Sequence, residues 1–176
     1  MTKRTSGVGV LCVAMASVCG TAFGESRVGI RDVYLNGLEA PSVWVAAKEA
    51  TTPLLEVVVE KDLSCPGLFE GKEKPYRIDT PENRRKLMDA IKKNECEIIA
   101  FCTVVPFSKD SNDAENAAWI GRVAHAAAEM KVPVIMMPLG AGGIEQDEFL
   151  KRAVTFVKAV APFARANKVQ LTVENL

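Results

Sequence analysis

The chain has 176 residues, of which 48% are hydrophobic and 25% are charged, and its 22 basic and 22 acidic residues leave a formal net charge of zero. This length predicts one domain, and the composition is ordinary for a globular protein. The balanced charge indicates neither a basic nucleic-acid footprint nor a polybasic membrane patch, so no nucleic-acid partner is expected.

The first two dozen residues have the pattern of a secretory signal peptide. Lys3 and Arg4 form a short basic segment, an apolar stretch follows, and small residues end at Gly24. We therefore expect residues 1–24 to be removed and residues 25–176 to form the domain of a periplasmic or secreted protein. A retained anchor is the alternative, but a membrane span needs roughly 20 apolar residues, so no stable span is expected after cleavage.

Strand and helix signals alternate along the rest of the chain. The run LLEVVVE is apolar and β-branched, which is typical of a strand covered on both faces in a parallel sheet. Thr80 and Pro81 mark the start of a helix as its N-cap and first helical residue. The pattern predicts five strands over residues 27–35, 54–60, 97–105, 132–139 and 169–174, with helices over 40–50, 81–94, 113–131 and 146–167.

Strict alternation of this kind predicts a parallel sheet with right-handed crossovers. Two α/β architectures fit: a partial (β/α)8 TIM barrel with five parallel strands, or an open doubly wound parallel sheet. The length favours the open sheet, because a complete barrel needs about 250 residues. The residues at the end of the chain favour the barrel.

Two acidic residues follow apolar strands, at the sheet edge where active sites of parallel α/β folds lie. They are Glu60 after VVV and Glu174 after LTV. A carboxylate that closes an apolar strand carries a desolvation cost, so it needs a metal or another cation as partner. Glu60 is the candidate for facing a substrate, and Glu174 is the candidate for binding a metal or another cation. The alternatives are that Glu60 only begins a loop and that Glu174 is solvated.

Other chemically active residues give weaker signals. Cys65, Cys96 and Cys102 are odd in number and do not form a disulfide framework, and zinc-ligand spacing is absent. His125 lies in a helical pattern and is interpreted as a structural or surface residue. The segment GAGG (140–143) could hold an anion before a helix, but a flexible connector is the favoured interpretation.

Three segments carry a family resemblance. The helix TPENRRKLMDAI, the segment AENAAWIGRVAHAAAEMKVPVI and the closing LTVENL resemble the sugar phosphate isomerase/epimerase family, whose domain is a xylose-isomerase-like TIM barrel. The resemblance runs from Arg27 to the end of the sequence and covers five of the family's eight βα units. It implies that Glu174 is a ligand of a divalent metal (Mn, Mg, Co or Zn) and an acid/base carboxylate.

The same resemblance implies an incomplete site. The family's other metal ligands come from three later strands, and the histidine that often ends its third strand is replaced here by CTVVPFS. We therefore expect an exported sugar isomerase/epimerase-like protein whose full-length form moves a proton next to the carbonyl of a small sugar or polyol with the help of a metal. As this chain it is expected to be truncated and inactive, to bind no metal tightly, and to self-associate through open sheet edges.

Two other functions fit the sequence. A non-catalytic secreted α/β domain could bind carbohydrate or be a remnant of an enzyme. A flavodoxin-like sheet binding a small ligand is disfavoured, because the loop after the first strand, DVYLNGLEAP, lacks a glycine-rich phosphate cradle.

Overall fold

A computed structural model describes residues 28–175, so the expected signal peptide lies outside the described residues. No helix within residues 28–175 is long and apolar enough to cross a membrane. The elements, in chain order, are β1 (Ile30–Arg31), the 3-10 helix η1 (Asp32–Gly37), α1 (Val43–Glu49), β2 (Leu54–Val58), α2 (Pro81–Lys93), β3 (Glu97–Cys102), β4 (Val105–Ser108), α3 (Asp113–Met130), β5 (Val134–Gly142), α4 (Gln146–Asn167) and β6 (Gln170–Asn175).

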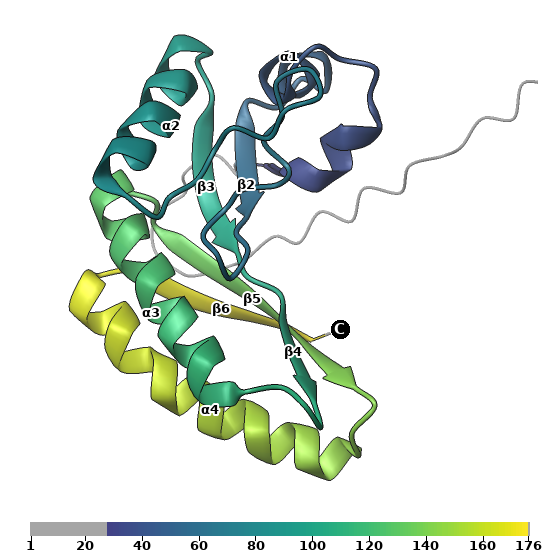
Figure 1. Cartoon of the computed structure of the whole chain (residues 1–176), viewed down its shortest axis with the longest axis vertical. Coiled ribbons are helices and arrows are strands. Elements are labelled where there is room, and N and C mark those ends of the chain that lie inside the picture. Colours follow the sequence, from purple (N-terminus) through teal and green to yellow (C-terminus); the bar gives the residue numbers. More distant parts are fainter. Residues whose placement is uncertain (1–27, 176) are drawn as a thin grey trace, which may run out of the picture.

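All paired strands are parallel, and they lie side by side in the order in which the chain makes them (Figure 1). The strands β3 and β4 pair with successive parts of β5, so together they occupy one position in the sheet. A doubly wound sheet reverses its strand order at a switch point, whereas this order does not reverse. The described residues therefore form a partial barrel that is not closed, as predicted, and the open doubly wound alternative is wrong.

The third barrel strand continues further than the sequence pattern predicts. It breaks at Thr103 and resumes as β4, which contains Pro106. Among the described strands β4 pairs only with β5, and an edge position tolerates a proline that cannot donate a ladder bond. Opposite it, Gly140–Gly142 belongs to β5, so most of GAGG is strand and not a flexible connector.

The first strand is shorter than predicted, because a side chain takes over its ladder. The N–H of Val58 donates to Oδ1 of Asp32 at 3.1 Å, where a further strand residue would offer its carbonyl. A side chain that bonds the backbone in this way competes with regular pairing. The chain then turns into η1 directly after Arg31.

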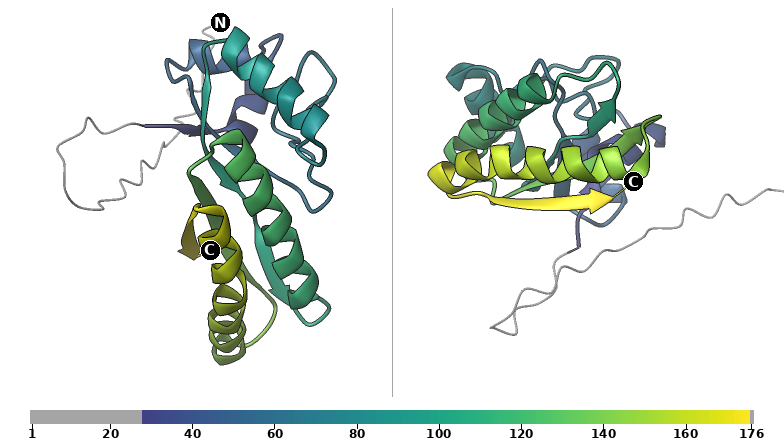
Figure 2. Two further views of the ribbon diagram at one scale, coloured as in Figure 1. Left: turned by 90° about the vertical axis from the view of Figure 1, so that its left-hand side faces the viewer. Right: turned by 90° about the horizontal axis from the view of Figure 1, so that it is seen from below.

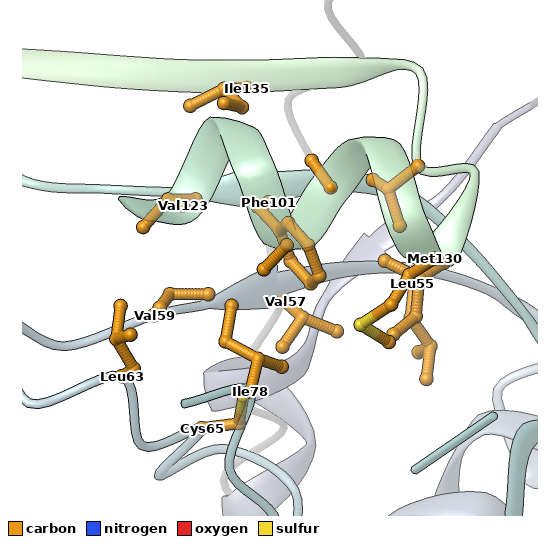
Figure 3. Packing of buried hydrophobic residues seen from close by; sticks show 14 of the residues in the cluster. Leu55, Val57, Val59, Leu63, Cys65, Ile78, Phe101, Val123, Met130 and Ile135 are labelled. Carbon is orange, nitrogen blue, oxygen red and sulfur yellow. The ribbon is translucent and has the colours of Figure 1, made fainter. Parts of the chain in front are cut away.

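Three long helices cover one face of the sheet (Figures 1 and 2). The predicted cap of α2 is confirmed, because the hydroxyl of Thr80 accepts the N–H of Asn83 at 3.1 Å. Beneath α3, outward-facing residues of three neighbouring strands form a core with side chains of that helix (Figure 3). The labelled members from these elements are Leu55, Val57, Phe101, Ile135, Val123 and Met130.

The helices α3 and α4 end in the same way. Lys131 and Lys168 adopt left-handed backbone conformations with φ of 59° and 56°. Each is followed by a valine whose side chain is buried and whose N–H returns to the last helical turn. This arrangement satisfies the free carbonyls of a helix end and directs the chain into the next strand.

Candidate functional site

Four side chains from four different strands meet on the sheet face opposite the long helices. We call them the interior cluster: Arg31 of β1, Glu56 of β2, Met136 of β5 and Glu174 of β6. Nε of Arg31 donates to Glu56, which lies directly opposite on the neighbouring strand. Its Nη2 lies 3.2 Å from Oε2 of Glu174 and 3.4 Å from Sδ of Met136. Arg31 lies on one edge strand, β1, and contacts Glu174 on the other, β6. The sheet must therefore curve toward this face, so the cluster lies on its concave side.

The charges of the interior cluster are partly withdrawn from solvent. The side chains of Arg31, Glu56 and Glu174 are 19%, 13% and 25% exposed. Burial alone would lower the pKa of Arg31, but its hydrogen bonds to Glu56 and Glu174 and the nearby negative charges outweigh burial and raise it. The guanidinium therefore stays charged and binds both carboxylates through different nitrogen atoms.

Asp32 lies next to the interior cluster and is completely buried. Its Oδ1 accepts the N–H of Val58, whereas Oδ2 has no hydrogen-bond partner among the described residues. Burial raises the pKa of Asp32 to about 7, against the opposing effect of backbone N–H groups that bond it. Gly67 packs on this carboxyl, because a Cβ there would lie 2.2 Å from Cγ of Asp32.

The two acids predicted from sequence lie in different surroundings. Glu174 is on the concave face at the end of β6 and joins the interior cluster, so the alternative of a fully solvated side chain is wrong. Glu60 lies in an exposed turn after β2, where its backbone bonds Ser64 and Leu63. It forms no ion pair within the described part of the chain, and its contact with a substrate stays a prediction.

Sequence reasoning missed Arg31 and Glu56. A signal for Glu56 was present, because a carboxylate in the middle of the apolar run LLEVVVE needs a partner. The alternation of strand side chains also places Glu56 on the face opposite Leu55 and Val57, which are core residues. Arg31 carried no comparable signal, since its partner Glu174 is 143 residues away.

The cysteines and the histidine lie as predicted. Cys65, Cys96 and Cys102 are free and buried, and His125 is a surface residue paired with Glu129 at 3.0 Å. Burial raises the pKa of Cys102 to about 12, so this thiol near the interior cluster stays protonated at neutral pH.

The described residues do not by themselves fit a divalent metal. Within residues 28–175 no three His, Cys, Asp or Glu side chains are grouped as ligands. Glu174, the ligand implied by the family resemblance, is bound to a guanidinium. One carboxylate that is already paired with a cation offers too little to hold a metal ion.

Comparison with known proteins bears on the fold. No protein-family model matches the chain. A search of curated proteins also finds no match. A crystal structure described as a D-tagatose 3-epimerase-like protein is similar, with a TM-score of 0.52 and 17% sequence identity over 84% of this chain. The likeness supports the fold described above, a parallel α/β sheet that forms part of a barrel. The chain spans about half of that structure (52%), and at this identity the likeness concerns the barrel fold alone.

Proposed function

We propose that this chain supplies the first five strands of a sugar isomerase/epimerase-like barrel, in which Glu174 transfers a proton next to the carbonyl of a small sugar or polyol. The observation that carries the proposal is the position of Glu174. Its carboxylate ends the fifth barrel strand, turns to the concave face and is held there by Arg31. Barrel enzymes place their catalytic groups at the carboxyl ends of their strands.

The chemistry needs an ionised base on one face of the substrate. Glu174 would take the proton from the carbon beside the carbonyl, leaving an enediolate. Return of the proton to the other face or to the neighbouring carbon would give the epimer or the isomer. Arg31 supports this role because its guanidinium, at hydrogen-bond distance, holds the carboxylate of Glu174 on the concave face.

The proposal includes a divalent cation (Mn, Mg, Co or Zn) in the complete site, which would stabilise charge on the substrate oxygens. Its other ligands would have to come from outside the described residues, because these residues do not hold a metal site on their own. Export also belongs to the proposal and rests on residues 1–24. Self-association through the sheet edge is supported by β6, which pairs with β5 and with no other described strand.

Two measurements test the function. The reading frame beyond codon 176 is sequenced first, and we expect an in-frame continuation with an acid, a histidine and a glutamate at later strand ends. The longest product is then incubated with ketoses in D₂O, and loss of the proton signal beside the carbonyl is followed by NMR. We expect exchange that is abolished by Glu174→Gln and unchanged by Asp110→Asn, a control at an exposed acid.

A non-catalytic carbohydrate-binding domain is the second candidate, favoured by the pairing of Glu174 with Arg31 instead of with metal ligands. A stop codon followed by unrelated sequence, together with sugar binding in saturation-transfer NMR and no exchange, would replace the enzyme proposal with this one. Exchange that persists in Glu174→Gln would remove Glu174 from the mechanism.

A further inference from the structure

The interior cluster holds two carboxylates and one organic cation. Glu56 and Glu174 come from strands that do not pair with each other, yet both bond Arg31. Without the guanidinium, two negative charges would face the same partly desolvated space. Like charges in such a space strongly favour either a proton or a bound cation.

The two bonds of Arg31 differ in how easily they can be given up. Glu56 lies directly opposite on the paired strand, so the sheet itself keeps the two side chains together. Glu174 is reached across the concave face by a different nitrogen, at 3.2 Å. The bond to Glu174 can therefore be broken while Arg31 remains on Glu56.

We propose that Arg31 is a positioning residue that serves as the resident cation of Glu174 and excludes a divalent ion from that carboxylate in this chain. The inference rests on the proposed function only for the identity of Glu174 as the site carboxylate. It accounts for the disagreement between the resemblance, which implies a metal at Glu174, and the structure, in which a guanidinium is bound there. It also makes Arg31 the residue that controls the affinity of the site for cations.

The test is Mn²⁺ binding to the 176-residue chain, measured from the EPR signal of the free ion. Arg31→Gln keeps polarity but removes the charge, and we expect it to tighten Mn²⁺ binding at least about tenfold, the size typical of changes around metal ligands. The double variant Arg31→Gln/Glu174→Gln is expected to lose this gain. A merely structural role for Arg31 predicts the opposite, because a loosened site binds less metal.

Arg77→Gln is the matched control, since Arg77 also lies between two carboxylates, but in solvent. It should not produce binding that depends on Glu174. If Arg31→Gln does not fold by circular dichroism, Arg31→Lys takes its place, because one ammonium cannot bridge both carboxylates and should give part of the gain.

Equal Mn²⁺ affinity of the wild type and the Arg31 variants, whether tight or undetectable, would overturn the inference. So would a gain in Arg77→Gln as large as that in Arg31→Gln. A Glu174-dependent gain in a protein that exchanges no sugar proton would support the inference and count against the proposed function, so the two can fail separately.

Discussion

Arg31 and Arg77 each lie between two carboxylates, but in different surroundings. Arg31 lies in the interior cluster and bonds residues of two distant strands. Arg77 bonds Asp62 at 2.9 Å and Asp79 at 3.1 Å, all within the loop between β2 and α2, where we call these residues the loop cluster. The loop cluster is largely exposed and orders a loop, whereas the interior cluster links the first barrel strand to the fifth.

The pKa values of Asp32 and Asp62 show the effect of burial on the two regions most directly. Burial raises the pKa of Asp32, beside the interior cluster, to about 7. Hydrogen bonds from the hydroxyl and N–H of Ser64, and from Arg77, lower the pKa of Asp62 in the loop cluster to about 2. The pKa values of these two aspartates thus shift in opposite directions. The carboxyl of Asp32 is buried and one of its oxygens has no hydrogen-bond partner among the described residues, whereas that of Asp62 is exposed and hydrogen-bonded.

The largest expected effect is the pH dependence that Asp32 causes. The folded-state pKa lies above the ordinary value of 3.8, so the folded chain keeps a proton that the unfolded chain loses. The free energy of unfolding should therefore fall between about pH 4 and pH 7, by about 4 kcal/mol, and stay level above this range. Asp32→Asn should remove this decline in urea titrations at several pH values.

Asp62→Asn is the control for this pH dependence. Its lowered pKa predicts stabilisation that is present above the ordinary pKa and is lost only as the pH falls toward 2. Wild-type stability that rises from pH 4 to pH 7 would contradict the assignment of Asp32.

The second effect is the loss of a central guanidinium. Arg31→Met should lower the free energy of unfolding by about 3 kcal/mol, because it leaves two partly buried carboxylates without their cation. Arg77→Met should leave the urea midpoint nearly unchanged, because water solvates Asp62 and Asp79. Equal shifts in the two variants would show that burial does not distinguish the two clusters.

The third effect concerns Gly67, which lies in the loop that carries the loop cluster but packs on Asp32. Gly67→Ala should destabilise the protein by about 2 kcal/mol, because the added methyl group has no space beside the buried carboxyl. Gly37→Ala is the control, since open space surrounds that position, and thermal melting should show little change. An unchanged melting temperature for Gly67→Ala would mean that the loop does not seal Asp32 from water.

The sequence allowed the order of elements and the position of Glu174 to be predicted, because hydrophobic periodicity and helix caps are local signals. The partnership of Glu174 was not accessible, since Arg31 lies on the opposite edge of the sheet and only the curvature of the strands brings it near. The first strand is shorter than the predicted residues 27–35, because the side chain of Asp32 bonds the backbone of β2 in place of a further strand residue. The strand predicted over residues 97–105 continues through Pro106, because an edge position accommodates a proline.

The left-handed lysines after α3 and α4 bear on how the molecule is assembled. Each closes its turn with backbone bonds to residues only a few positions earlier, so the joint between helix and next strand is defined locally. Because strand order in the sheet follows chain order, the strand with which each new strand pairs has already been synthesised. Such a sheet can fold during translation one strand at a time, because no strand needs a distant later segment as its pairing partner.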